Sequence, residues 1–308
     1  MLNSTIMQAF GDQLESAVRR CQSPTLVGLD PRFDSLPAPL TIGRDSRNLA
    51  DVAAAFETFC KGVIDVVAPR VAAVKPQAAF FEQFGVPGMA ALAATIAYAR
   101  EKGLLVILDG KRNDIGSTAE AYADAYLGAE SAWRADALTV SPYLGDDSLA
   151  PFVKVATARG GGIFVLVKTS NPGGGLFQNV ADSEGPLYRH VARHVEALNG
   201  AHASGSRFGS VGAVVGATYP EQLAELRDVM PHAWFLVPGY GAQGGSASDV
   251  AGAFDADGLG AIVNNSRGII FAHAKDDRFG DDRWQDAVDA ATQEMIANLR
   301  DSTPAGRL

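Results

Sequence analysis

The chain has 308 residues, 47% of them hydrophobic, and a formal net charge of -9. This excess of acidic residues, 35 against 26 basic ones, argues against an extended nucleic-acid surface, which needs clustered Lys and Arg. The sequence contains no run of 18 apolar residues, so no transmembrane helix is predicted. Met1–Gln13 lacks the features of a signal peptide. Cys21 and Cys60 form no CxxC pair, so we expect two reduced thiols in a cytoplasmic protein without a membrane partner.

Short apolar runs alternate with helical patterns along the chain, and each run is nearly all apolar, as in parallel strands buried on both faces. The predicted strands are Thr25–Leu29, Val71–Val74, Leu104–Leu108, Ala137–Val140, Ile163–Val167, Val211–Val215, Trp234–Val237 and Ala261–Val263. The predicted helices are Leu49–Val67, Gly88–Lys102, Ile115–Leu127, Ser148–Ala158, Pro186–Leu198, Pro220–Val229, Ala247–Phe254 and Asp282–Leu299.

This alternation predicts the α/β class and a (β/α)8 TIM barrel. We expect a single domain over residues 1–308, with long loops near 31–47, 171–185 and 199–207. A doubly wound open sheet is the alternative, and it is less favoured because no obvious edge strand is present. In a barrel, the functional face lies at the carboxyl ends of the strands.

Charged residues follow three consecutive predicted strands. Asp30 ends the first strand, Lys75 follows the second, and Asp109 and Lys111 follow the third. Side chains alternate along a strand, so Asp109 and Lys111 are expected to point the same way, into the mouth of the barrel. Buried charges are costly unless they are paired, and alternating Asp and Lys side chains provide that pairing. We favour a catalytic array over a structural ion-pair network; Asp114, farther along, also fits a helix N-cap.

The last two strands end in segments typical of a phosphate site. Strand seven runs into Pro238-Gly-Tyr-Gly-Ala-Gln243-Gly-Gly, and strand eight into Asn264-Asn-Ser-Arg267-Gly268. Glycine lets backbone N–H groups approach an anion closely, and Arg offers a bidentate fork. Loops after strands seven and eight are the recurrent phosphate position in this architecture. After strand five, Ser170 lies in a polar segment that can reach over a ligand.

These motifs together resemble the orotidine 5′-phosphate decarboxylase family in its longer bacterial form. The matching stretches are Gly28-Leu-Asp30-Pro, Val74-Lys75-Pro76, Asp109-Gly-Lys111-Arg-Asn-Asp114-Ile115, Lys168-Thr-Ser170-Asn-Pro-Gly, Val237-Pro238-Gly and Asn265-Ser-Arg267-Gly. They occur in barrel order from residue 28 to about 268. The resemblance implies decarboxylation of orotidine 5′-phosphate to uridine 5′-phosphate in pyrimidine biosynthesis, with no metal and no cofactor.

The resemblance also implies roles for individual residues. Asp30 and Lys75 would hold the ribose hydroxyls and the charge array, and Asp109 and Lys111 would flank the substrate carboxylate and C6. Ser170 would contact the pyrimidine. Gln243 and Arg267 would hold the phosphate, with the Gly268 N–H as an addition. Asp114 and Thr118 would reach the neighbouring site of a homodimer.

Three other functions remain open from the residues themselves. A metal-dependent sugar-phosphate lyase or synthase of the same barrel group shares the Asp-x-Lys core. A class I aldolase would use Lys75 or Lys168 as a Schiff base. A non-catalytic protein that binds a phosphate ligand is the third, but simple binding does not require buried opposing charges.

Overall fold

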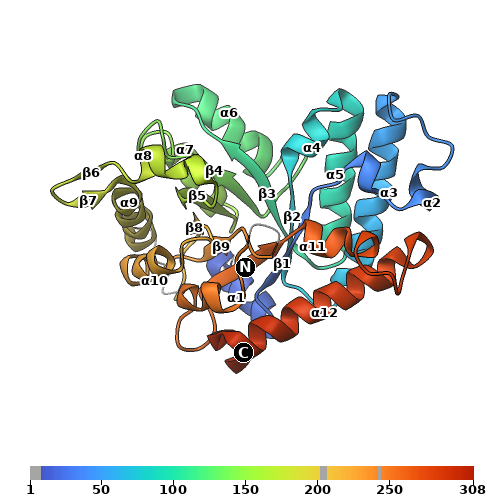
Figure 1. Ribbon diagram of the computed structural model, residues 1–308. Helices are drawn as coiled ribbons and strands as arrows, with labels where there is room; N and C mark the ends of the chain where they lie inside the picture. The colour runs from blue at the N-terminus through green and yellow to red at the C-terminus, as the bar shows by residue number, and fades with distance from the viewer. Residues whose placement is uncertain (1–7, 202–206, 242–243) are drawn as a thin grey trace, which may run out of the picture.

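The computed structural model describes residues 8–201, 207–241 and 244–308, and its central feature is a closed barrel of eight parallel strands (Figure 1). Around the barrel the strands follow the order β1-β10-β9-β8-β5-β4-β3-β2. They are β1 (Thr25–Leu29), β2 (Ala73–Pro76), β3 (Leu105–Arg112), β4 (Ala137–Val140), β5 (Gly162–Lys168), β8 (Val211–Val215), β9 (Phe235–Val237) and β10 (Ala261–Asn265). The predicted (β/α)8 barrel is confirmed, and the open-sheet alternative is excluded because β1 pairs with both β2 and β10.

Helices connect the strands and cover the outside of the barrel. The longer ones are α3 (Leu49–Val67), α5 (Gly85–Glu101), α6 (Gly116–Leu127), α7 (Ala150–Thr157), α9 (Leu187–Ala201), α10 (Pro220–Val229) and α12 (Trp284–Ser302). The helix predicted over Ala247–Phe254 is present as the 3-10 helix η3 (Ser248–Ala253). Among the helices of the described ranges, none combines the length and apolar composition needed to span a bilayer.

Short elements occupy the segments predicted as long loops. Residues 31–47 contain η1 (Phe33–Ser35) and α2 (Ala38–Thr41). Residues 171–185 contain η2 (Pro172–Gly174), α8 (Gly175–Gln178) and most of a hairpin formed by β6 (Ala181–Asp182) and β7 (Gly185–Pro186). In the third segment, α9 continues to residue 201. The remaining short helices are α4 (Ala78–Glu82), α11 (Arg267–Ile270), η4 (Ala272–Ala274), η5 (Asp281–Arg283) and η6 (Pro304–Arg307).

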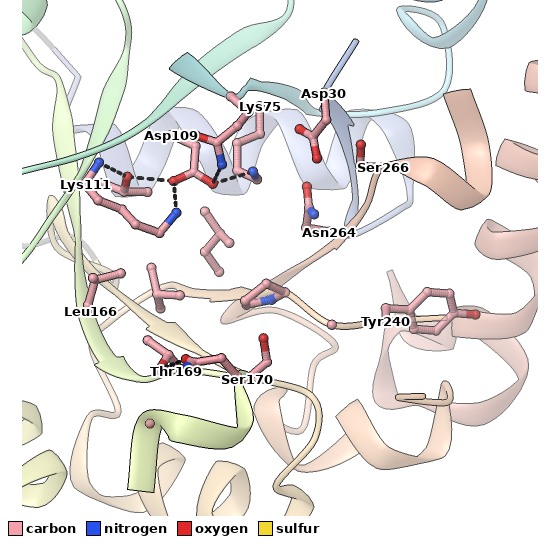
Figure 2. A pocket seen from close by; sticks show the side chains of 18 of the residues that line it. Asp30, Lys75, Asp109, Lys111, Leu166, Thr169, Ser170, Tyr240, Asn264 and Ser266 are labelled. Atoms are coloured by element: carbon pink, nitrogen blue, oxygen red, sulfur yellow. Dashed lines mark hydrogen bonds and ion pairs between the residues drawn. The ribbon is translucent and has the colours of Figure 1, made fainter. Parts of the chain in front are cut away.

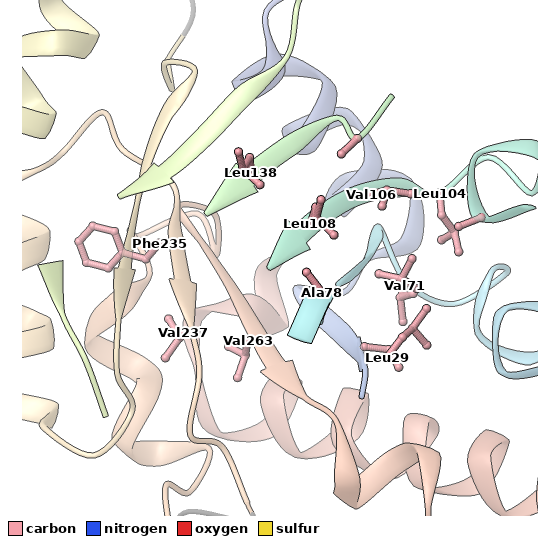
Figure 3. Packing of buried hydrophobic residues seen from close by; sticks show 14 of the residues in the cluster. Leu29, Val71, Ala78, Leu104, Val106, Leu108, Leu138, Phe235, Val237 and Val263 are labelled. Atoms are coloured by element: carbon pink, nitrogen blue, oxygen red, sulfur yellow. The ribbon is translucent and has the colours of Figure 1, made fainter. Parts of the chain in front are cut away.

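Two apolar cores result from the alternation of side chains along the strands. Outward-facing residues pack beneath the helices, and Figure 3 shows part of this layer, including Leu29, Leu108 and Val263. Inward-facing residues such as Leu26, Ile107 and Phe164 fill the barrel. The interior is therefore a packed core, and a ligand can be bound at its upper end, where the strands end.

Helix α1 (Phe10–Cys21), which lies outside the predicted set, closes the lower end of the barrel. The ring of Phe10 meets that of Phe164 edge to face, with ring centroids 5.9 Å apart. A Cβ on Gly162 would lie 2.4 Å from the Phe10 ring, so glycine makes room for it. The indole N–H of Trp234 donates a hydrogen bond to the Gly11 carbonyl at 3.1 Å. These contacts make α1 an integral part of the barrel core.

Phe10→Ala should therefore lower the free energy of unfolding by about 3–5 kcal/mol, since it leaves a cavity beneath Phe164. Chemical denaturation would measure this loss. Val86→Ala is the control: Val86 is 83% exposed, and its change should stay within about 0.5 kcal/mol. Equal effects of the two substitutions would contradict a structural role for α1.

Candidate active site

A cavity of about 680 Å³ opens at the carboxyl ends of the barrel strands (Figure 2). Its walls come from the ends of β1, β2, β3, β4 and β10 and from the segments that follow β5 and β9. The lining residues used below are Asp30, Lys75, Gln77, Asp109, Lys111, Thr139, Ser170, Phe177, Gln178, Tyr240, Asn264, Ser266 and Arg267. The cavity lies where barrel enzymes bind their substrates.

The carboxylate of Asp109 is the centre of a hydrogen-bonded array at the base of this cavity. One oxygen, Oδ2, accepts from Lys75 Nζ at 2.6 Å and from Gln77 Nε2 at 3.0 Å. The other, Oδ1, accepts from Lys111 Nζ at 2.6 Å and from the Thr139 hydroxyl at 3.0 Å. Asp109 is thus held by groups from three neighbouring strand ends, and it separates two ammonium groups.

Burial and charge act in opposite directions within this array. Burial disfavours the charged forms, but the two ammonium groups outweigh it and lower the pKa of Asp109 far below its usual range. Burial likewise opposes the charge on Lys75, yet the carboxylates of Asp109 and Asp30 raise the pKa of its ammonium. Both groups are therefore ionised at neutral pH. The Lys111 side chain is 48% exposed, whereas that of Lys75 is 5% exposed.

The backbone around Lys111 departs from a regular strand. Pairing of β3 with β4 shifts register between Leu108 and Arg112, and Lys111 adopts a left-handed conformation with φ 46°. Few non-glycine residues adopt this conformation. The Lys111 N–H donates to the Thr139 hydroxyl at 2.9 Å, which holds the turn in place. This turn directs the Lys111 side chain back to Asp109. The two side chains meet as predicted, but the cause is the left-handed turn and not the alternation of side chains along a regular strand.

The structure brings most of the predicted site residues together. Asp30, Lys75, Asp109, Lys111, Ser170 and Arg267 all line the one cavity. Asp114, Thr118 and Gly268 do not line it: Asp114 is half-buried and Thr118 exposed in the first turns after β3. The Gly268 N–H donates to Asn265 Oδ1 at 3.2 Å. Gln243 lies outside the described residues.

Sequence reasoning missed Gln77 and Thr139, both of which bind Asp109. Gln77 is two residues beyond Lys75 and Thr139 is the next-to-last residue of β4, so alternation alone places them on the inward face. Both residues are uncharged, and sequence reasoning relied on charged residues at the strand ends, so it did not identify them. The segment after β5 also contributes Phe177 and Gln178 to the cavity wall. The Gln178 side-chain amide accepts a hydrogen bond from the Thr169 N–H at 3.1 Å and donates one to the Thr169 hydroxyl at 2.7 Å.

Lys168 does not line the cavity. Its ammonium donates to Asn179 Oδ1 at 2.6 Å and lies over the rings of Tyr188 and Tyr219. Burial lowers its pKa, but the side chain faces the helices rather than a ligand. Lys75 faces the cavity with a raised pKa. Because a Schiff-base lysine needs a neutral amine beside its substrate, neither residue fits a class I aldolase.

Within the described ranges, no group of three or more His, Cys, Asp or Glu side chains is placed to hold a metal ion. The cavity instead offers alternating Lys and Asp groups at its base and an exposed Arg267 at its rim. A parallel barrel with such groups at its strand ends defines a barrel enzyme for a small anionic substrate.

The chain belongs to the orotidine 5′-phosphate decarboxylase/HUMPS family, whose model matches residues 38–278. A curated relative, the orotidine 5′-phosphate decarboxylase of Rhodopirellula baltica, is 55% identical over 301 residues, which is 96% of this chain and all of that protein. The solved OMP decarboxylase of Leishmania donovani is 35% identical with a TM-score of 0.74, covering 96% of this chain and 98% of that one. The UMP synthase structure from the same organism is 37% identical with a TM-score of 0.76, covering 96% of this chain but 56% of that longer one.

Asp109→Asn should lower the free energy of unfolding at neutral pH by about 3 kcal/mol, because it leaves the buried Lys75 ammonium without its counter-charge. The folded-state pKa of Asp109 is lowered. Its stabilisation is therefore complete above the ordinary carboxyl pKa of about 4 and is lost as the pH falls further. Urea titrations at neutral and acidic pH should show the difference between wild type and variant narrowing below about pH 4.

Asp276→Asn, which removes an exposed ion pair with Arg278, is the matched control and should change stability little. A difference between wild type and Asp109→Asn that stays constant down to acidic pH would contradict the charge assignment.

Proposed function

We propose that the chain decarboxylates orotidine 5′-phosphate to uridine 5′-phosphate and CO2, the reaction that gives its relatives their name. The observation that carries this proposal is the placement of Asp109 between Lys75 and Lys111 at the base of the cavity. A metal-dependent synthase of the same family is the second candidate, and it would need a divalent ion at the site. Each carboxylate oxygen of Asp109 already accepts two hydrogen bonds, one of them from a lysine ammonium, so this carboxylate is not free to bind a divalent ion, which favours the decarboxylase.

Loss of CO2 breaks the bond between C6 and the carboxylate and leaves the electron pair on C6, in the plane of the ring, where no π system delocalises it. Lys111 is the group we assign to this carbanion. Its ammonium stabilises the developing negative charge and then donates a proton to C6. The proton lost from Lys111 is regained from solvent, for which its half-exposed side chain is suited.

Asp109 contributes by its position as well as by repulsion. Its bonds to Lys75 and Lys111 keep both ammonium groups at the base of the cavity. A substrate carboxylate ~4 Å from Asp109 would be repelled by about 4 kcal/mol at an effective dielectric near 20, and the repulsion disappears when neutral CO2 leaves. We assign the larger share of rate acceleration to Lys111, since it acts on the charge that forms in the transition state.

Arg267 is the residue we assign to the phosphate. It is exposed at the rim of the cavity, at the start of α11, while the charge array lies at the base. A bidentate hold on the phosphate, far from C6, supplies binding energy that keeps the reacting ring in place. Ser170, in the segment after β5, is placed to contact the pyrimidine ring in such an arrangement.

The decisive assay follows the absorbance of orotidine 5′-phosphate with and without EDTA. We expect turnover that survives chelation, because Lys and Asp side chains supply the chemistry. Lys111→Ala is the control for contaminating activity and should reduce turnover by roughly 10³-fold or more. A strict requirement for Mg²⁺, or turnover only of an open-chain sugar phosphate, would show that the chain is a metal-dependent synthase instead.

We also propose a homodimer in which Asp114 and Thr118 of each subunit complete the neighbouring site. The support is that neither residue lines the cavity of its own subunit, although both follow β3 closely. Ile115 (55% exposed) and Tyr143 (76% exposed) leave apolar surface after β3 and β4 that a second copy would cover.

Mixing Lys111→Ala with Asp114→Ala subunits tests this arrangement. Each homodimer is defective at both sites, whereas a heterodimer carries both substitutions in one site and neither in the other. Random exchange should restore about a quarter of wild-type activity, because half of the dimers are mixed and each has one intact site. Exchange is verified by native mass spectrometry. Heterodimers without restored activity would show that Asp114 acts in its own subunit.

A further inference from the structure

Three side-chain oxygens on one side of the cavity are buried and have no hydrogen-bond partner among the described residues. They are Asp30 Oδ1, Asn264 Oδ1 and Ser266 Oγ. Asn264 and Ser266 are each only 9% exposed, and all three residues line the cavity. An unpartnered buried polar atom is destabilising, so groups of this kind call for an explanation. Three of them at one position indicate a polar subsite.

The fold creates this cluster at the contact between β1 and β10. Side chains alternate along β1, so Leu26 in the barrel core, Gly28 and Asp30 share the inward face. Gly28 makes room for the side chains opposite: a Cβ there would lie 2.7 Å from Ser266 Cβ and 3.1 Å from Asn264 Oδ1. Asn264 and Ser266 therefore lean over β1, directly below Asp30. Figure 2 shows the three side chains together, next to Lys75.

The order of the strands places this cluster between the two ends of the proposed substrate. The charge array comes from β2 and β3, on one side of β1. Tyr240 follows β9 and Arg267 follows β10, on the other side. A nucleotide bound with its base at the array and its phosphate at Arg267 has its sugar against β1 and β10. The cluster therefore faces the part of the ligand that carries hydroxyl groups.

We infer that Asn264 and Ser266 bind the sugar hydroxyls beside Asp30, for which that role is already expected, and that these two residues set the preference for a ribonucleotide over a deoxynucleotide. This inference rests on the proposed function and adds two specificity-determining residues to it. The Asp30 and Asn264 oxygens accept hydrogen bonds, whereas the Ser266 hydroxyl both donates and accepts. A sugar hydroxyl does both as well. A ligand that lacks the hydroxyl leaves these groups unpartnered, which is the basis of strong discrimination.

Binding of the product tests the inference without catalysis. Calorimetry would compare the affinities of uridine 5′-phosphate and its 2′-deoxy and 3′-deoxy analogues for wild type, Asn264→Leu and Ser266→Ala. Wild type should prefer the ribonucleotide over at least one analogue. Each variant should reduce that preference by roughly 3- to 10-fold, the value of one hydrogen bond. The melting temperature should stay the same or rise, because an unpartnered polar atom has been removed.

Thr25→Val is the matched control. Thr25 is also fully buried on β1 with an unpartnered hydroxyl, but it lies at the start of the strand, away from the cavity. Its removal should leave the ribonucleotide preference unchanged.

The outcomes separate this inference from the proposed function. If wild type neither turns over orotidine 5′-phosphate nor binds its product, the proposed function is wrong and the subsite assignment falls with it. If wild type is active but shows no ribonucleotide preference, or if Ser266→Ala and Asn264→Leu both keep it intact, the subsite alone is overturned. A lower melting temperature with an unchanged preference would identify Asn264 and Ser266 as structural residues.

Discussion

The paired charges of Asp109 organise the whole upper end of the barrel. A carboxylate and an ammonium as buried as those of Asp109 and Lys75 are tolerated only when each is the other's partner. Gln77 and Thr139 each donate a further hydrogen bond to the Asp109 carboxylate. Together with the two lysines, they fix the orientation of this carboxylate. This arrangement requires that three neighbouring strands end at the same height, which the closed parallel barrel provides. Below it the interior is apolar and above it the cavity is polar.

Much of this architecture was predictable because its signals are local. Parallel strands buried on both faces appear as continuous apolar runs, and helices such as Leu49–Val67 have the predicted bounds. Charges that directly follow buried strands stand out for the same reason, and they converge because parallel strands end at one face. Asp30, Lys75, Asp109 and Lys111 were found in this way.

What the sequence could not show depends on contacts between distant segments. Gln77 and Thr139 are unremarkable polar residues until barrel closure brings both to Asp109. The left-handed turn at Lys111 is held by a hydroxyl on the next strand, so no local pattern predicts it. The role of helix α1 appears only when the barrel has formed and its lower end must be closed. The grouping of Asn264 and Ser266 depends on Gly28, whose role appears only when β1 and β10 are paired.

Closure of the lower end by α1 also determines how the chain can be connected to other proteins. The helix lies at the start of the strands, and Arg300 near the end of α12 donates to the Gln22 carbonyl just after α1, at 2.9 and 3.2 Å. Leu308 packs against the same inner core as Phe10 and Leu14 of α1, so the carboxyl end of the chain lies on this side of the barrel. The cavity opens on the opposite side, at the carboxyl ends of the strands. A fused domain, a purification tag or a surface attachment placed after Leu308 therefore leaves the mouth of the barrel unobstructed.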